Sequence, residues 1–179
     1  MRSLLHGMPV AVKDNIHTTN MPTTGGALAF DGFVPPYEAT LVKNLRDARA
    51  IVIAKTGMTE LANWVANGMP GNYDAVGGYG FNPYDPRRDP RPATGDGRPS
   101  LGTVGFSSGV GAAASFWAAN VGTETSVSIL SPANQNMLVG IKPTVGRVRR
   151  YGVIPIIADA TILLGALEGA APDPNDPAT

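Results

Sequence analysis

The sequence predicts an α/β domain, and a strand, a helix and a second strand near its start carry this prediction. Residues 8–12 form a short apolar run that ends in polar residues, which is typical of a buried strand. Residues 37–50 carry apolar side chains at helical spacing, with Thr40 as the expected N-cap. They lead directly into residues 51–54, a fully apolar run that predicts a second strand. This order of elements indicates a parallel βαβ unit.

Further elements are expected downstream, separated by one long irregular segment. Residues 68–105 are dominated by Gly, Pro, Asn and Asp without periodicity, which predicts a long loop that is either functional or disordered. The other expected elements are a helix that begins at 59–64, an alanine-rich helix at 109–120, a strand end at 139–143 and a short helix at 161–167. We predict one domain over residues 1–170 and a disordered tail over residues 171–179.

Composition limits the classes of function. The 179 residues suffice for one domain with a buried core. Lys plus Arg and Asp plus Glu both number 14, so charge gives no reason to expect nucleic acid or an anionic membrane as a partner. The absence of cysteine and the presence of only His6 and His17 argue against a disulfide framework and a zinc cluster. No apolar run is long enough to span a bilayer and no signal peptide is evident, so a cytoplasmic location is expected.

Two short motifs match known functional patterns, but the residues around them do not support those functions. The sequence GFSSG at 105–109 matches the G-x-S-x-G nucleophile elbow, which needs an acid and then a histidine later in the chain. No histidine follows His17, so a Ser-Asp-His hydrolase of that type is excluded. The sequence GVGAAA at 109–114 matches the dinucleotide fingerprint, but it lacks a preceding β-branched strand and an acidic residue about 20 positions later. Close packing of a helix explains these glycines better.

A third pattern is spread over most of the chain. Its blocks, in chain order, are GMPVAVKDN (7–15), KTGMTELA (55–62), NPYD (82–85), the serine–glycine turn (105–109), GTET (122–125) and GIKPTVGRV (140–148). In these blocks and their order the chain resembles the amidase signature family. The resemblance implies a mixed sheet covered by helices and a hydrolase that cleaves a carboxamide C–N bond without a metal or organic cofactor.

The resemblance also implies a Ser-Ser-Lys triad. The family's lysine falls on Lys13, its nucleophile on Ser128, and its bridging serine, held by a cis peptide bond in the family, on Ser107. A serine hydroxyl is a poor nucleophile until a base takes its proton. A lysine can be that base only when it is neutral, a form that burial favours. Ser107 would relay the proton between the two.

The turn before the nucleophile is the implied oxyanion hole, formed by backbone N–H groups of Thr125, Ser126 and Val127. The family usually has glycine at the last two of these positions, and a β-branched Val127 resists the tight conformations that glycine permits. Phe106 also stands where the family usually has glycine. A register shifted by one residue would place Phe106, which has no proton to pass, at the bridging position instead of Ser107.

Taken one at a time, the same residues have simpler interpretations. Lys13 could pair with Asp14 or cap a strand, and Ser107 and Ser108 could be ordinary turn residues. Ser128 could be a small buried residue that satisfies a backbone group. The family blocks, present together and in order, favour the catalytic site.

Length and missing features leave three functions open. Domains of the family are usually more than twice as long, and the Asp-x-x-Gly-Pro-type loop that usually follows the block near 152–156 is absent. We therefore expect a truncated amino-terminal portion of the fold with exposed apolar surface. The chain is then an amidase that acts on a small-molecule amide through an acyl-Ser128 intermediate, or a catalytically inactive remnant. The third function is an amidotransferase-like subunit that binds a partner, or itself, through an exposed sheet edge.

Overall fold

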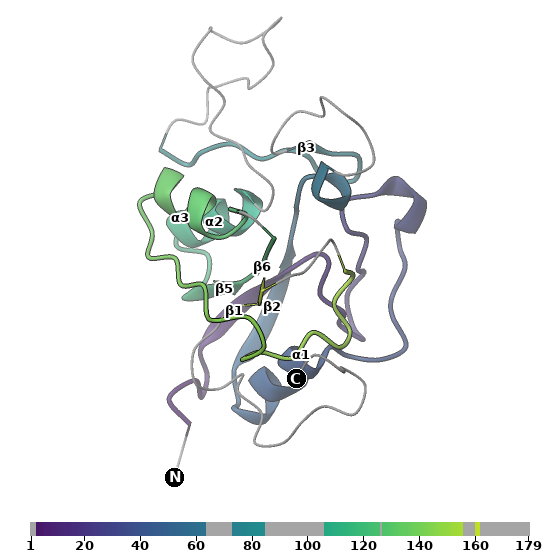
Figure 1. Ribbon diagram of the computed structural model, residues 1–179, viewed down its shortest axis with the longest axis vertical. Coiled ribbons are helices and arrows are strands. Elements are labelled where there is room, and N and C mark those ends of the chain that lie inside the picture. The colour runs from purple at the N-terminus through teal and green to yellow at the C-terminus, as the bar shows by residue number, and fades with distance from the viewer. Residues whose placement is uncertain (1–2, 64–72, 85–105, 126, 156–159, 162–179) are drawn as a thin grey trace, which may run out of the picture.

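A three-stranded parallel sheet forms the centre of the computed structural model (Figure 1). The structure describes residues 3–63, 73–84, 106–125, 127–155 and 160–161. Strand β1 (Pro9–Lys13) lies between β2 (Ile51–Thr56) and β5 (Ala119–Val121), and both pairings are parallel. Helix α1 (Thr40–Asp47) connects β1 to β2, which confirms the predicted βαβ unit.

Smaller elements surround this sheet in the described part of the chain. They are the 3-10 turns η1 (Leu28–Phe30) and η2 (Glu60–Asn63), the strands β3 (Tyr73–Asp74), β4 (Gly78–Tyr79), β6 (Thr123–Glu124) and β7 (Ala160–Thr161), and the helices α2 (Phe106–Ala113) and α3 (Leu130–Gln135). The pairs β3–β4 and β6–β7 are antiparallel. The predicted α/β class is therefore confirmed, with parallel and antiparallel pairs in separate sheets. No described helix is long and apolar enough to cross a membrane.

The hydrophobic core lies between the sheet and α1. Its fully buried members include Val10, Val12, Ile16, Leu41, Val42, Leu45 and Val121. The apolar side of α1 meets the strands, as the helical spacing predicts. The predicted cap is wrong, because Ala39 is the N-cap residue and Thr40 already belongs to the helix. The N–H groups of Ala39 and Thr40 donate instead to the carbonyls of His17 and Tyr151, at 3.1 Å each, so no side-chain cap is needed.

A shift in strand pairing decides which side chains share a face of the sheet. After Val10 the register of β1 against β2 moves by one residue, which leaves one residue of β2 without a partner. Lys13 consequently pairs with Thr56, and Val12 pairs with Lys55. Because paired residues on neighbouring strands point to the same face, Thr56 shares the face of Lys13, and Lys55 lies on the opposite face.

The alanine-rich helix ends earlier than the prediction of 109–120. Helix α2 stops at Ala113, and Ser115 has a φ of 61°, in the left-handed region that ends helices. The chain then turns to run beside β1, where Ala118 N donates to Pro9 O at 3.0 Å and β5 follows. Pairing with a central strand outweighs the helix propensity of the alanines.

Close packing explains the glycines of α2, as predicted. A Cβ atom on Gly109 would lie 2.8 Å from Asn136 Nδ2 and 2.9 Å from Pro132 O, both of the α3 region. A Cβ atom on Gly111 would lie 1.9 Å from the Trp117 ring. Glycine lets α2 approach α3 and the Trp117 ring closely, so these residues have a packing role.

Three further predictions need correction. The helix expected at 59–64 is the turn η2, in which Leu61 and Ala62 have φ of 39° and 55°. Its backbone bonds to a distant segment instead, since Leu61 N donates to Gly25 O at 2.8 Å. Within the predicted loop at 68–105, strands β3 and β4 form a short hairpin. Residues 139–143 form no strand, because the chain after α3 folds back against that helix, with Leu138 N donating to Ala133 O at 2.8 Å.

The carboxyl-terminal predictions are tested only at one point. Thr161 lies in β7, paired with Thr123, and so does not begin a helix at 161–167. Residues 162–167, the domain boundary at 170 and the tail at 171–179 lie outside the described residues.

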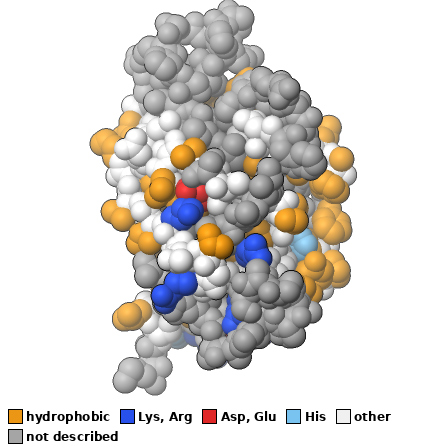
Figure 2. Space-filling model, viewed as in Figure 1, with side chains coloured by type: hydrophobic (Ala, Val, Ile, Leu, Met, Phe, Trp, Pro, Cys, Tyr) orange, Lys and Arg blue, Asp and Glu red, His pale blue; other side chains and the backbone are white. Residues whose placement is uncertain are grey.

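Large apolar side chains are exposed on the described surface, as expected from the sequence. On the face drawn in Figure 2, hydrophobic side chains lie on both sides of the molecule, and those on the left lie over α3 and the segment after it. The exposed apolar residues of this region are Leu130, Met137, Val139, Ile141 and Val145. We call these five residues the α3 patch.

Candidate active site

Lys13 ends the central strand with its side chain inside the protein. The residue is 1% exposed, and its Nζ atom donates to Thr123 Oγ1 at 2.9 Å and to Thr123 O at 3.1 Å. Thr123 belongs to β6, which follows the edge strand β5 after one residue. The strand that carries Lys13 thus aims it at the start of the segment that leads to Ser128.

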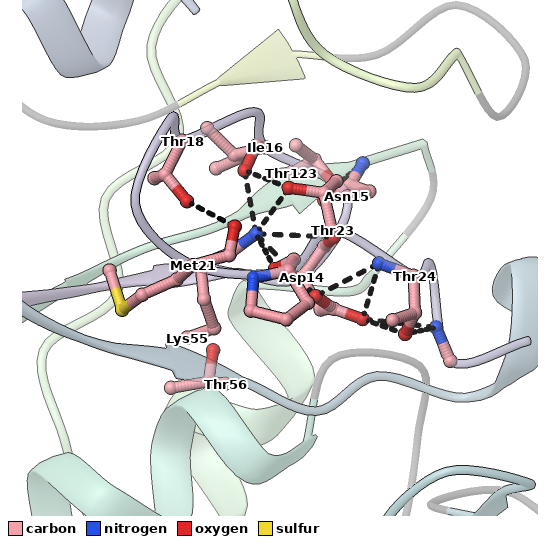
Figure 3. Close-up of polar contacts among 12 residues, drawn as sticks. Asp14, Asn15, Ile16, Thr18, Met21, Thr23, Thr24, Lys55, Thr56 and Thr123 are labelled. Carbon is pink, nitrogen blue, oxygen red and sulfur yellow. Dashed lines mark hydrogen bonds and ion pairs between the residues drawn. The ribbon is translucent and has the colours of Figure 1, made fainter. Parts of the chain in front are cut away.

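Asn15, two residues after Lys13, also binds Thr123 (Figure 3). Its Nδ2 atom donates to Thr123 Oγ1 at 3.1 Å and to Ile154 O at 3.3 Å. Thr123 is therefore a buried junction for Lys13 and Asn15. Thr123 and Asn15 were not predicted as site residues, although both stand in the family blocks at 122–125 and 7–15.

Ser128 lies just before α3 and lines a cavity of about 350 Å³. Ser108 of α2 lines the same cavity, whose other walls are mostly small or apolar residues. The buried Glu124 sets the position of this loop, because its Oε2 atom accepts from Ile129 N at 2.7 Å and from Leu130 N at 2.9 Å. The carboxylate thereby satisfies two N–H groups at the start of α3 and ties both ends of the loop together.

The expected oxyanion residues occupy this loop. Thr125 and Val127 are both exposed, Val127 at 51%. Ser126 lies outside the described residues. The directions of the three N–H groups therefore stay a prediction.

Ser107 belongs to the first turn of α2, and its side chain lies outside the described part. Its neighbour Ser108 has its Oγ atom 2.9 Å from Thr56 Oγ1. Because Thr56 pairs with Lys13 on one face of the sheet, this contact brings the start of α2 to the face on which Lys13 lies. No peptide bond among the described residues is cis.

Asp14 points away from this cluster. Its carboxylate accepts from the N–H groups of Thr24 and Gly26, at 3.1 Å and 3.2 Å, and from the Thr24 hydroxyl. Its Oδ1 atom also lies 3.5 Å from the Lys55 ammonium. Burial lowers the pKa of Lys55 to about 8, while the charge of Asp14 and its hydrogen bond act in the opposite direction.

The structure thus connects parts of the predicted site in pairs, through Thr123 and through α2. It places Lys13 against Thr123, the start of α2 on the same face, and Ser128 on a cavity shared with α2. The family model described as Amidase fits residues 1–163. The chain belongs to the amidase family.

Individual members of the amidase family are similar over almost the whole chain. A protein of Arabidopsis thaliana named "Probable amidase" is 38% identical, over 98% of this chain and 35% of its own length. A glutamyl-tRNA(Gln) amidotransferase subunit of an Anaeromyxobacter species is 35% identical, again over 98% of this chain and 35% of its own. The crystal structure of the peptide amidase from Stenotrophomonas maltophilia superposes with a TM-score of 0.85 and 38% identity, over 99% of this chain and 36% of that one.

This chain therefore spans about a third of the length of the amidase relatives that it matches. The match in fold confirms the amidase-like core that the sequence predicts. The activity of the longer relatives does not follow from this third alone.

Proposed function

We propose that the chain carries the catalytic lysine and serines of an amidase that hydrolyses a carboxamide C–N bond. In this mechanism Ser128 Oγ attacks the carbonyl carbon, and its proton passes through Ser107 to a neutral Lys13. The C–N bond then breaks, and the departing nitrogen receives that proton. Water attacks the acyl-Ser128 ester and gives a proton to the neutral Lys13. The ester C–O bond then breaks, Ser128 Oγ takes that proton through Ser107, and the carboxylic acid leaves.

The burial of the Lys13 side chain is the observation that carries this proposal. A lysine at 1% exposure, delivered by the central strand to the loop that bears Ser128, is in a position suited to a base. An ion pair between Lys13 and Asp14 explains the burial of Lys13 less well, because the Asp14 carboxylate binds the backbone at Thr24 instead. The short loop that Glu124 holds supports the nucleophile's position.

The cavity beside Ser128 suits the acyl part of a small amide. Its volume is about 350 Å³, and Ala112, Pro132 and Ile141 are among its apolar walls. Relatives are named for amidase, peptide amidase and amidotransferase activity, which is consistent with an amide as substrate. A cytoplasmic location and the absence of a cofactor stay predictions.

Labelling with a fluorophosphonate probe, mapped by peptide mass spectrometry, tests the mechanism. The probe should label Ser128, and Ser128→Ala should lose the adduct. Lys13→Met, which keeps the length of the side chain but removes the base, should slow labelling by about 100-fold or more. Ser131→Ala in α3 and Lys43→Met on the exposed side of α1 are matched controls that should label normally.

Circular dichroism and a thermal melt must show that each sample is folded. If the folded wild-type chain takes no label, or if the adduct persists in Ser128→Ala, the mechanism is wrong. The chain is then better described as an inactive remnant of the family fold. Phe106 and Val127, which stand where the family usually has glycine, would explain the loss of activity.

We also propose, as a second candidate, a protein that is completed by a partner chain. The exposed α3 patch favours this function, since apolar surface of this kind marks sites of association. The relatives are compatible with either candidate, because one is named as part of an amidotransferase and another simply as an amidase.

A further inference from the structure

Lys55 has a set of contacts that the proposed reaction does not use. Its side chain leaves β2 on the face opposite Lys13 and ends among oxygen atoms of the segment after β1 (Figure 3). Its Nζ atom donates to Ile16 O and Thr23 Oγ1, at 2.8 Å each, and to Pro22 O at 3.0 Å. A compact ammonium has three N–H donors, and these are three acceptors at normal hydrogen-bond length.

The acceptors of Lys55 come from both ends of one loop. Ile16 lies where the chain leaves β1, and Pro22 and Thr23 lie where it returns. Thr23 Oγ1 also donates to Ile16 O at 3.3 Å, so the two ends meet at the ammonium. Asp14 Oδ1, at 3.5 Å from Lys55 Nζ, adds an opposite charge. Lys55 therefore closes the loop onto β2.

This loop begins at Lys13, and its first residues are bonded to both neighbouring segments. Asp14 N donates to Thr56 O at 2.9 Å, and Ile16 N donates back to Lys13 O at 3.0 Å. Because Ile16 N is hydrogen-bonded to Lys13 O, movement at Ile16 would pull on the backbone that directs Lys13 toward Thr123.

We propose that Lys55 is a positioning residue for Lys13: its ammonium joins Ile16, Pro22 and Thr23 and so holds the Lys13 side chain in register with Thr123. This role rests on the proposed function for its catalytic consequence. The shifted pairing between β1 and β2 makes it possible, since an unshifted register would pair Lys55 with Lys13 itself and place both lysine side chains on one face.

The environment of Lys55 suits a lysine better than an arginine. The titratable groups that face it are Asp14 and His17; burial, followed by the charge of Lys55, lowers the pKa of His17. Because burial lowers the pKa of Lys55 only to about 8, its ammonium is still charged at neutral pH. A planar guanidinium keeps the charge but cannot direct its donors at the same three oxygens.

The test measures the rate of fluorophosphonate labelling at Ser128 against pH, in wild type, Lys55→Arg, Lys55→Met and the control Lys43→Met. Both Lys55 variants should label about 10-fold more slowly, because a small displacement of a base is costly. The midpoint of the pH profile should move upward, since a loosened Lys13 gains water. A change in Lys55→Arg assigns the effect to geometry and not to lost charge. A purely structural role would not move this midpoint.

Hydrogen–deuterium exchange of residues 14–24 gives a readout that needs no activity. Exchange there should increase in both Lys55 variants and stay unchanged in Lys43→Met. The proposal is wrong if the folded Lys55 variants keep three wild-type properties. These are the rate of labelling at Ser128, the midpoint of its pH profile and the exchange of residues 14–24. If the Lys55 variants do not fold, Thr23→Val, which removes one acceptor, decides by the same readouts. If wild type takes no label, the proposed function fails separately, and exchange alone decides whether Lys55 holds the loop.

Discussion

Three consecutive residues at the end of β1 perform three different tasks. Lys13 donates to Thr123, Asp14 accepts from the backbone at Thr24, and Asn15 spans from Thr123 to Ile154. Alternation along the chain sends Lys13 and Asn15 to one side and Asp14 to the other. The partners lie as far as 139 positions away, so only the fold brings them together.

Titration of a single residue, Lys55, should make the free energy of unfolding depend on pH. Burial lowers its pKa from an ordinary value of 10.5 to about 8, so between these values the unfolded chain binds more protons than the folded chain. The part of the free energy of unfolding that depends on the titration of Lys55 is therefore complete above pH 10.5 and is lost as the pH falls through 8. Its size is about 3 kcal/mol.

Urea unfolding across this pH range checks the prediction. The difference in the free energy of unfolding between wild type and Lys55→Met should grow with rising pH, whereas the difference between wild type and Lys43→Met should stay flat. Parallel curves for wild type and Lys55→Met would contradict it.

At the scale of elements, packing of α2 sets the geometry around the cavity. Its contact with α3 and with the Trp117 ring requires a surface without side chains at Gly109 and Gly111. Ser108 of the same helix meets Thr56 of β2, so this packing also places the start of α2 against the sheet. The helix thus links the two walls of the candidate site.

Gly111→Ala should destabilise the protein, because the new Cβ atom would lie 1.9 Å from the Trp117 ring, which must move. Overpacking of this kind costs about 1–3 kcal/mol. Gly122→Ala is the matched control, since its Cβ atom would meet Ile129 at an ordinary 3.5 Å. Thermal melts of both variants measure the difference, and equal melting temperatures would show that the α2 contact is looser than described.

At the scale of the molecule, the α3 patch is the feature that bears on association. Val139 is 90% exposed, and Ile141 at 43% lies beside it on the rim of the cavity. Exposed apolar side chains that lie together favour contact with another apolar surface. A second copy of the chain or a partner subunit could provide that surface.

The double variant Val139→Lys/Ile141→Lys should remain monomeric at concentrations where the wild-type chain associates with itself or with an added candidate partner. Light scattering coupled to size exclusion measures the mass. Leu4→Lys is the control, because Leu4 is 98% exposed but lies far from the patch in sequence and outside it. Association that is equal in the double variant and in wild type would place the contact elsewhere.

Local pattern predicted more of the first half of the fold than of the second. Residues 8–12 and 51–54 became β1 and β2, because buried apolar runs next to a connecting helix have few other solutions. The segment at 109–120 was divided instead, since its alanines suit a helix while the edge of β1 offers backbone partners from Ala119 onward. Thr40 was displaced from the cap position by carbonyls that only the fold supplies.

The sequence by itself determined the α/β class, the family blocks and the residue types of the candidate site, Lys13 and Ser128 among them. Those features depend on side-chain chemistry and short-range spacing, which can be read along the chain. Only the tertiary structure decided that Thr123 receives Lys13, that a one-residue shift sends Lys55 to the opposite face, and that Ser108 and Ser128 share a cavity. Those features depend on strand register and helix packing, where contacts between distant residues set the geometry.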